Sequence, residues 1–263
     1  MSSATTEALS TRYGPEGVLE FRILGPLEVV DADRVRPLGG KLLRGLILAL
    51  LLHACELRTP DQLIDDLWGD CPPATARASL HNLVSTLRRT LGRDVLETTH
   101  SGYVLAVTED RVDAFRFERL LDRARGACVV EKVRLLDQAL GLWRGSPLVD
   151  VRYEEFAQGE IRRLEELRVD ALEELLAAKL ELGAGAALVP ELERLVDGFP
   201  LREQLRMQLM VALHRSGRSV EALGSYVDWR RTLIDAWGIE PGCAIRQVWD
   251  DIRLQTSELE VVH

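Results

Sequence analysis

Apolar and polar residues alternate in short segments along the first part of the chain, and these segments predict strands and helices in turn. The run LEFRILGPLEVV, residues 19–30, alternates on either side of Gly25-Pro26, which predicts two strands with a turn between them. Residues 35–38 can add a short hairpin strand to this pair. Leucines fill most positions of residues 40–54, so this segment is expected to form a largely buried helix.

Two further helices and a hairpin are predicted next. Thr59-Pro60-Asp61-Gln62 favours a helix start, because threonine can cap the helix, proline suits its first position and glutamine stands three residues after the cap. We expect this helix to run to about Trp68, and a third helix to begin near Pro73 and end at Gly92. Two strand-like runs then surround the turn His100-Ser101-Gly102. Strands, three helices and a hairpin are the order of elements in a winged helix-turn-helix.

The pattern changes near residue 112, after which helical segments follow one another with hardly a strand candidate. Helices are predicted over residues 153–182, 186–198, 201–215 and 219–236, with glycines or short turns between them. Such helix pairs suggest divergent tetratricopeptide-like stacking. The predicted fold is therefore mainly α, with an N-terminal winged helix-turn-helix that has small β-sheets and a C-terminal all-α tetratricopeptide-like helical domain.

Residue sizes in the last helix pair fit such stacking. We expect Ala222 and Gly224 to allow close approach of helices, while Tyr226 and Trp229 supply bulk. Stacked helix pairs form a concave surface that binds protein segments. The large aromatic residues are nevertheless expected to be mostly ordinary core: Trp143, Phe156, Tyr226, Trp229 and Trp237.

The predicted third helix has one apolar face and one face of small and polar residues. At about 100° per residue, one stripe collects Ala76, Leu80, Leu83, Val84, Leu87 and Leu91, and this stripe is expected to face the core. The opposite face suits a DNA major groove, where bulky side chains would clash with bases and acidic ones would repel phosphates. The candidates for reading bases are Thr75, Ala78, His81, Asn82 and Ser85. Asn82 comes first, because asparagine can pair both of its amide groups with one adenine. The candidates for phosphate contact are Arg77, Thr86, Arg88 and Arg89, with His100 and Ser101 at the hairpin turn.

The predicted third helix differs in charge from the rest of the chain. The formal net charge is -9, yet Cys71 to Gly92 contains three arginines and no acidic residue. Residues 1–112 hold 12 Lys and Arg against 15 Asp and Glu, and residues 113–263 hold 21 against 27. Neither half is basic, so any nucleic-acid contact must come from a local patch. The alternative is an ordinary solvated helix face, and the turn at His100 and Ser101 can equally be a solvated turn.

Other classes of protein find little support in the sequence. The start of the chain is polar, and the longest apolar run, Leu46 to Leu52, is far shorter than the roughly 20 residues that span a bilayer. We therefore expect a loose N-terminal arm and no membrane contact. Scattered cysteines and histidines favour reduced thiols in a cytoplasm, with no metal site and no cofactor. Gly39-Gly40-Lys41 lacks the spacing and the hydroxyl of a phosphate loop, and neither catalytic residues nor an enzyme are predicted.

Motifs along the chain, in their order, give a more specific indication. FRILGPLEV, GGKLLRGLILALLLHA, TPDQLIDDLWGDCPPATARASLHNLVSTLRRTLG and the hairpin's Gly102-Tyr103 resemble the OmpR-type winged helix of the Streptomyces antibiotic regulatory proteins. VDAFRFERLL, ALGLWRGSPLVDV and FPLREQLRMQLMVALHRSGRSVEALGSYVDWRRTLIDAWGIEPG resemble the bacterial transcriptional activator domain of the same family. The resemblance implies four parts: an arm (1–17), a winged helix-turn-helix DNA-binding domain (18–112), a bacterial transcriptional activator domain (113–255) and a tail (256–263).

The resemblance also implies a function. Members of this family are DNA-binding transcriptional activators of secondary-metabolite or antibiotic gene clusters, which places the chain in the cytoplasm with the nucleoid. The implied partners are double-stranded promoter DNA with direct repeats, a second copy of the chain bound head-to-tail, and RNA polymerase holoenzyme. Many members have arginine where this helix has Thr86, which can donate to a phosphate oxygen but carries no charge. The competing class is a helical-repeat scaffold whose winged domain docks protein, and it predicts little affinity for DNA.

Overall fold

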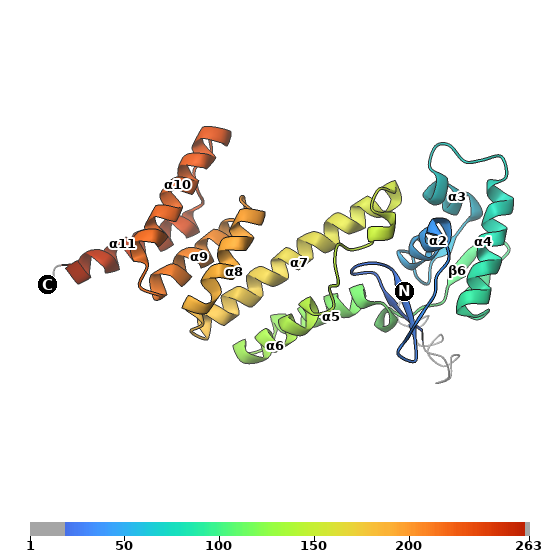
Figure 1. Ribbon diagram of the computed structural model, residues 1–263, viewed down its shortest axis with the longest axis horizontal. Coiled ribbons are helices and arrows are strands. Elements are labelled where there is room, and N and C mark those ends of the chain that lie inside the picture. The colour runs from blue at the N-terminus through green and yellow to red at the C-terminus, as the bar shows by residue number, and fades with distance from the viewer. Residues whose placement is uncertain (1–18, 261–263) are drawn as a thin grey trace. The chain divides into compact units, whose positions relative to one another are not determined.

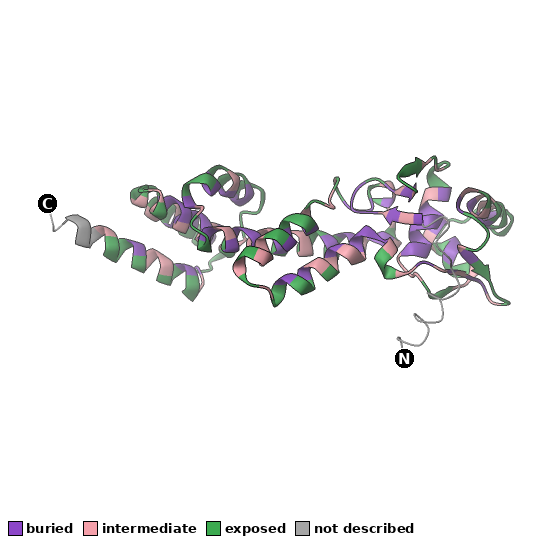
Figure 2. Ribbon diagram, turned by 90° about the horizontal axis from the view of Figure 1, so that it is seen from below, coloured by how far each residue is buried: buried purple, intermediate pink, exposed green. Residues whose placement is uncertain are grey.

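The computed structural model describes residues 19–260, which form two compact units (Figure 1). The N-terminal unit contains the described residues up to Arg123 together with residues 138–169. The C-terminal unit contains residues 124–137 and the described residues from Asp170 onward. Along most helices of each unit, buried residues lie on one side and exposed residues on the other (Figure 2). The prediction of a mainly helical fold, with small sheets near the N-terminus, is confirmed.

The first sheet is antiparallel, with its strands in chain order: β1 (Leu19–Arg22), β2 (Glu28–Asp31) and β3 (Arg34–Arg36). Val30 of β2 pairs with Glu20 on one side and with Val35 on the other. Between β2 and β3, Ala32 and Asp33 have φ values of 46° and 68°, the left-handed conformation that a two-residue hairpin turn requires. The predicted strand pair and its added hairpin strand are confirmed.

Three helices of the N-terminal unit pack against one another: α2 (Lys41–Leu51), α3 (Pro60–Trp68) and α4 (Ala76–Leu91). Every residue from Gly45 to Leu51 is buried, so α2 is a largely buried helix, as predicted. The capping box at the start of α3 is also confirmed. The Thr59 hydroxyl accepts from the Gln62 N–H at 3.3 Å, and the Gln62 carboxamide accepts from the Thr59 N–H at 2.9 Å.

The third helix begins three residues later than the sequence predicted, at Ala76 and not near Pro73. The Ala76 N–H donates to the Pro73 carbonyl at 2.9 Å, which closes a single turn before the helix. Thr75 has φ -94° and ψ 11°, a conformation between the helical and extended regions, and therefore stands at the cap position. The predicted apolar stripe of α4 is buried apart from Leu83, which is half-buried.

The second sheet has the order β4-β6-β5, with β4 (Leu57–Arg58), β5 (Leu96–Thr98) and β6 (Tyr103–Leu105). The predicted hairpin, the wing, is confirmed as β5 and β6, and β4 is an unexpected third strand. Gly102 is buried against β4, where a Cβ atom would lie 2.1 Å from the Arg58 carbonyl oxygen. Only glycine allows the wing to approach β4 so closely.

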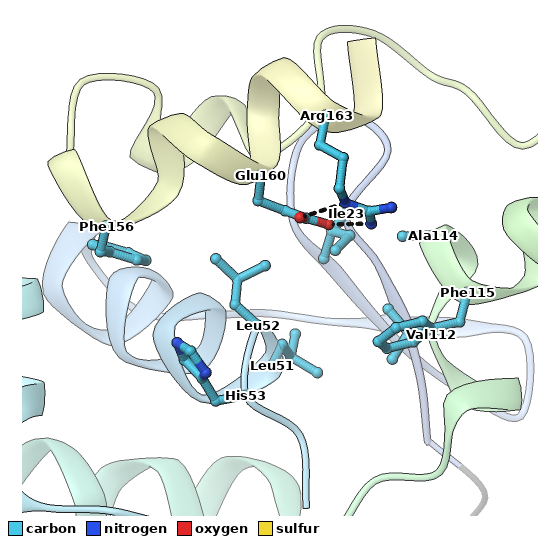
Figure 3. A pocket seen from close by; sticks show the side chains of 10 residues that line it. All are labelled: Ile23, Leu51, Leu52, His53, Val112, Ala114, Phe115, Phe156, Glu160 and Arg163. Atoms are coloured by element: carbon cyan, nitrogen blue, oxygen red, sulfur yellow. Dashed lines mark hydrogen bonds and ion pairs between the residues drawn. The ribbon is translucent and has the colours of Figure 1, made fainter. Parts of the chain in front are cut away.

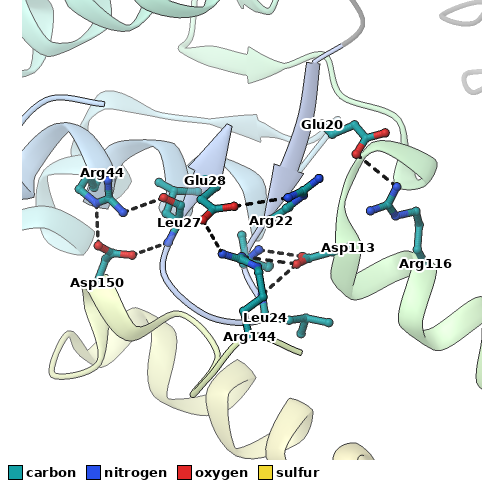
Figure 4. A network of polar contacts seen from close by, with 11 residues as sticks. Glu20, Arg22, Leu24, Leu27, Glu28, Arg44, Asp113, Arg116, Arg144 and Asp150 are labelled. Carbon is teal, nitrogen blue, oxygen red and sulfur yellow. Dashed lines mark hydrogen bonds and ion pairs between the residues drawn. The ribbon is translucent and has the colours of Figure 1, made fainter. Parts of the chain in front are cut away.

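Two carboxylates hold the connection between β1 and β2, in an arrangement that we call the β1–β2 clamp (Figure 4). Asp113 accepts from the N–H groups of Ile23 and Leu24 at 2.7 and 3.2 Å. Asp150 accepts from the Leu27 N–H and from Arg44 Nε, both at 2.6 Å. Asp113 and Asp150 lie beyond the pattern change at residue 112, so the start of the helical region folds as part of the N-terminal unit.

The two clamp carboxylates differ in their pKa values. Burial raises the pKa of Asp113, although two backbone N–H groups and the charge of Arg144, 3.8 Å away, act against burial. Burial also acts to raise the pKa of Asp150, but hydrogen bonds from Arg44 and Leu27 and the charge of Arg44 outweigh it and lower that pKa. The two sites differ in burial and in guanidinium contact: the Asp113 side chain is 2% exposed and Arg144 is 3.8 Å away, whereas the Asp150 side chain is 18% exposed and Arg44 is within hydrogen-bond distance at 2.6 Å.

The helical region consists of α5 (Asp113–Arg125), α6 (Val129–Leu140), α7 (Glu155–Glu181), α8 (Gly185–Gly198), α9 (Glu203–Arg215), α10 (Ser219–Trp237) and α11 (Cys243–Glu260). Helices α7 to α10 lie within about two residues of the predicted ranges, and Gly183 and Gly217, with φ of 90° and 82°, end α7 and α9. In the C-terminal unit, α9 packs against α8, α10 and α11. No helix among residues 19–260 is both long and apolar enough to cross a membrane.

Two expectations about α10 are wrong. Ala222 is fully buried as expected, but Gly224 is exposed and a Cβ atom there would meet nothing within 4 Å, because it lies two residues further round the helix on the solvent side. Tyr226 and Trp229 are core residues, and the Trp229 indole donates to the Pro200 carbonyl at 2.9 Å. Trp237, at the end of α10, is 63% exposed and is not core. Of the other aromatic candidates, Trp143 and Phe156 are half-buried.

Candidate nucleic-acid interface

The solvent face of α4 carries the residues that the sequence suggested for reading bases. Ala78, His81, Asn82 and Ser85 are all exposed on the helix, and Thr75 is exposed at its cap. Sixteen residues make α4 about 24 Å long. Its first turn contains no acidic residue and its last turn contains Arg88 and Arg89, which favourably complement the negative end of the helix dipole.

Asn82 lies in the middle of this face. Ala78 stands one turn before it and Ser85 one turn after it, so small side chains border the asparagine on its own side of the helix. The Asn82 carboxamide therefore extends further from the helix than the side chains of Ala78 and Ser85, and a base pair beside it can reach it without a clash with either. The arrangement suits a bidentate contact with a base edge.

Two arginines at opposite ends of α4 are available to solvent. Arg77 pairs with Asp61 of α3 at 2.5 Å, and their side chains are 69% and 73% exposed. Such an exposed pair is weak, so a phosphate can replace the carboxylate. Arg89 is exposed and donates to the Thr86 hydroxyl at 3.2 Å, which brings these two phosphate candidates together.

Arg88 is turned toward the wing. It is half-buried, donates to the Leu96 carbonyl at 3.0 Å and also donates to the Thr98 hydroxyl. In the same last turn of α4, the Thr90 carbonyl accepts from Arg36 of β3 at 2.6 Å. These contacts connect the last turn of α4 to a strand of each sheet.

The tip of the wing is a compact turn. The Thr99 hydroxyl accepts from the N–H groups of Ser101 and Gly102 at 3.2 and 3.1 Å. His100 is exposed and Ser101 is half-buried at this tip. The hydrogen bonds from Thr99 fix the turn, so both candidates have defined positions on the protein surface.

One basic residue near the interface was missed by the sequence analysis. Arg93 follows Gly92 directly after α4 and is exposed. Its signal was present in the sequence, because Arg93 extends the acid-free segment Cys71 to Gly92 by one residue at its basic end. It places a further positive charge between α4 and the wing.

A cavity of about 270 Å³ lies elsewhere in the N-terminal unit (Figure 3). Its walls are mainly apolar, and they include Leu51, Phe115 and Phe156. Its charged groups are already paired, since Arg163 donates to Glu160 and to Glu118 and His53 contacts Glu56 at 3.2 Å. Across residues 19–260, no cluster of three or more His, Cys, Asp or Glu is placed to hold a metal ion.

A winged helix-turn-helix with an exposed, acid-free α4, joined to an all-helical region, defines a class of transcriptional regulators. Residues 112–253 match the bacterial transcriptional activator domain. The chain is 35% identical to the regulatory protein DnrI of Streptomyces peucetius, over 88% of this chain and 90% of that protein. It is 36% identical to the regulatory protein AfsR of Streptomyces griseus, over 92% of this chain but only 25% of that longer protein.

A solved structure agrees with these similarities. The structure of Mycobacterium tuberculosis EmbR in complex with a low affinity phosphopeptide matches 91% of this chain and 66% of that chain. The TM-score is 0.84 and the sequence identity is 34%. The chain therefore belongs to the Streptomyces antibiotic regulatory protein family, whose members carry a bacterial transcriptional activator domain. It is a transcriptional activator of this type and not an enzyme.

Proposed function

We propose that the chain activates a secondary-metabolite or antibiotic gene cluster by binding direct repeats near a promoter and recruiting RNA polymerase holoenzyme. The observation that carries the proposal is the solvent face of α4. It is free of acidic residues in an acidic chain, small or polar along its middle and basic toward both ends. Such a face can enter a major groove without bulky side chains that clash with bases, and without an acidic side chain of α4 that repels phosphates.

Each side chain has a separate role in this proposal. Asn82 reads one base pair, with Thr75, Ala78, His81 and Ser85 against neighbouring base edges. Arg77, Thr86 and Arg89 contact phosphates, as do His100 and Ser101 at the wing tip. We assign Arg88 chiefly to positioning, because its guanidinium is directed at the Leu96 carbonyl and the Thr98 hydroxyl.

Direct repeats require two copies that read the same side of the DNA. Their α4 helices would lie about one helical turn apart, roughly 34–36 Å. A head-to-tail pair uses different surfaces on the two copies, so the arrangement does not require a dimer in solution. The all-helical region is then available to contact the neighbouring copy or the polymerase.

A salt titration of DNA binding tests the proposal. The full-length protein is titrated onto promoter DNA from its own gene neighbourhood and onto scrambled DNA of equal length. We expect tight, repeat-dependent binding that weakens as salt rises. Equal and feeble binding to both DNAs would contradict the proposal and favour a protein-docking scaffold.

Variants assign the contacts. Asn82→Ala should relax preference at one base pair by about 1–3 kcal/mol, while Arg89→Ala should weaken binding to every sequence and reduce the salt slope by about 1. Arg162→Ala removes an exposed arginine of α7 and is the matched control for the loss of one charge. If both α4 variants bind as the control does, α4 does not lie in the groove.

A further inference from the structure

A shallow groove of about 290 Å³ lies within the C-terminal unit, between the last turns of α7, the length of α9 and the second turn of α11. We call it the α9 groove, because α9 supplies most of its lining residues. Its apolar lining comes from Ala177, Leu180, Met207, Val211 and Val248. These residues belong to alternate helices of the stack, the positions from which helical arrays build a continuous binding surface.

One buried polar group in this groove lacks a partner. The Gln208 side chain lines the groove and is 4% exposed. Its Nε2 donates to the Glu173 carbonyl at 2.8 Å, which fixes the orientation of the carboxamide. Its Oε1 is buried and has no hydrogen-bond partner among the described residues. Since buried acceptors are rarely left unpaired, the groove is built for an N–H or O–H donor.

A second carboxamide points to an extended chain as that donor. Gln204 also lines the groove and stands one helical turn before Gln208. Two residues that are four apart on a helix are separated by about 6 Å along its axis. Every second residue of an extended peptide repeats at about 6.6 Å. The two glutamines therefore match successive backbone groups on one side of an extended peptide.

Charged residues at the rim of the groove indicate which peptide sequences would bind. Arg215 donates to the Leu180 carbonyl at 2.5 Å, so its guanidinium is already directed at the end of α7. Glu181 is exposed at the rim and no ion pair to it is present among the described residues. A carboxylate beside an apolar groove favours a ligand with a positive charge next to an apolar side chain.

We propose that the α9 groove binds an extended segment of a partner protein, in which an apolar side chain stands next to Lys or Arg. The apolar side chain fills the space beside Met207, Val211 and Val248. One backbone N–H of the segment donates to Gln208 Oε1, and the cation pairs with Glu181. The proposal is independent of DNA binding by α4.

Synthetic peptides of about nine residues, long enough to cross the groove when extended, provide the test. Labelled peptides with a central Leu next to either Lys or Glu are titrated with the full-length protein and followed by fluorescence anisotropy. We expect the Lys peptides to bind and the Glu peptides to bind roughly tenfold more weakly. Glu181→Lys should reverse this preference, whereas Asp235→Lys, the same change at an exposed position of α10, should not.

The hydrogen bond to Gln208 is tested without altering the protein. Methylation of each peptide nitrogen in turn should lower affinity roughly tenfold at one position, where the donor to Gln208 is lost. Absence of binding by any peptide, or binding that ignores both Glu181→Lys and N-methylation, would overturn the proposal. Concentration-dependent self-association of the chain that Glu181→Lys abolishes would instead make the occupant a second copy.

Discussion

Asp150 is the residue of the β1–β2 clamp whose replacement should reduce the free energy of unfolding most clearly. Its carboxylate joins Arg44 and the Leu27 N–H, and the Arg44 and Asp150 side chains are 23% and 18% exposed. In Asp150→Ala, Arg44 keeps only its bond to the Leu27 carbonyl at 2.7 Å, and the Leu27 N–H loses its acceptor. Removal of one partner from a fully buried pair costs about 3–5 kcal/mol.

Solvent access reduces that cost. Because about a fifth of each side chain remains accessible, water can partly replace the lost contacts, and we expect about 2–3 kcal/mol of destabilisation. For a unit of this size the melting temperature should fall by about 2–4 °C per kcal/mol. Asp150→Asn should cost less, since its amide oxygen can still accept from Leu27.

Urea unfolding and hydrogen exchange measure the effect. Exchange at the Leu27 amide should accelerate in Asp150→Ala, and a double-mutant cycle with Arg44→Ala should give a coupling of about 1–2 kcal/mol. Glu240→Ala breaks an exposed pair with Arg230 and should leave the N-terminal unit unchanged. Unaltered Leu27 protection, or a coupling near zero, would refute the role given to the clamp.

Three further changes test other parts of the N-terminal unit. Gly102→Ala should destabilise it by about 2–3 kcal/mol in urea unfolding, because the new methyl group overlaps the Arg58 carbonyl; stability equal to wild type would contradict this packing. Arg88→Ala should weaken DNA binding without changing the salt slope if Arg88 acts through the wing, whereas a slope lower by about 1 would indicate a phosphate contact. The raised pKa of Asp113 means that the folded state binds its proton more tightly than the unfolded state does. The free energy of unfolding of wild type minus that of Asp113→Asn should therefore fall as pH rises from the ordinary pKa of 3.8 through the raised pKa. A difference that grows with pH would mean that folding lowers the pKa of Asp113.

Local signals made much of the fold predictable. The capping box at Thr59 and the apolar stripe of α4 depend on residues within one or a few turns, and both are present in the structure. The start of α4 was less predictable, because a proline such as Pro73 is common both in a turn and in the first turn of a helix. Here Pro73 belongs to the turn before the helix. A two-residue strand such as β4 leaves no periodicity in the sequence.

Long-range contacts could not be predicted from patterns. Asp113 and Ile23 are 90 residues apart in the sequence, and Asp150 and Leu27 are 123 apart. Nothing in the local sequence pattern distinguishes these two aspartates from acidic residues that are exposed to solvent. The same limit applies at the interface. The sequence placed Arg88 on the polar side of α4, but only the folded hairpin supplies the carbonyl that turns it toward the wing.

The β1–β2 clamp has a consequence for how such regulators can recombine. A chimera joined at residue 112 would separate the N–H groups of Ile23, Leu24 and Leu27 from their acceptors unless the new helical region carried matching carboxylates. A new DNA specificity is therefore more easily acquired by replacing the solvent face of α4 than by exchanging the whole winged domain. The boundary at residue 112, where the sequence pattern changes, is therefore not a boundary between the two units of the folded chain.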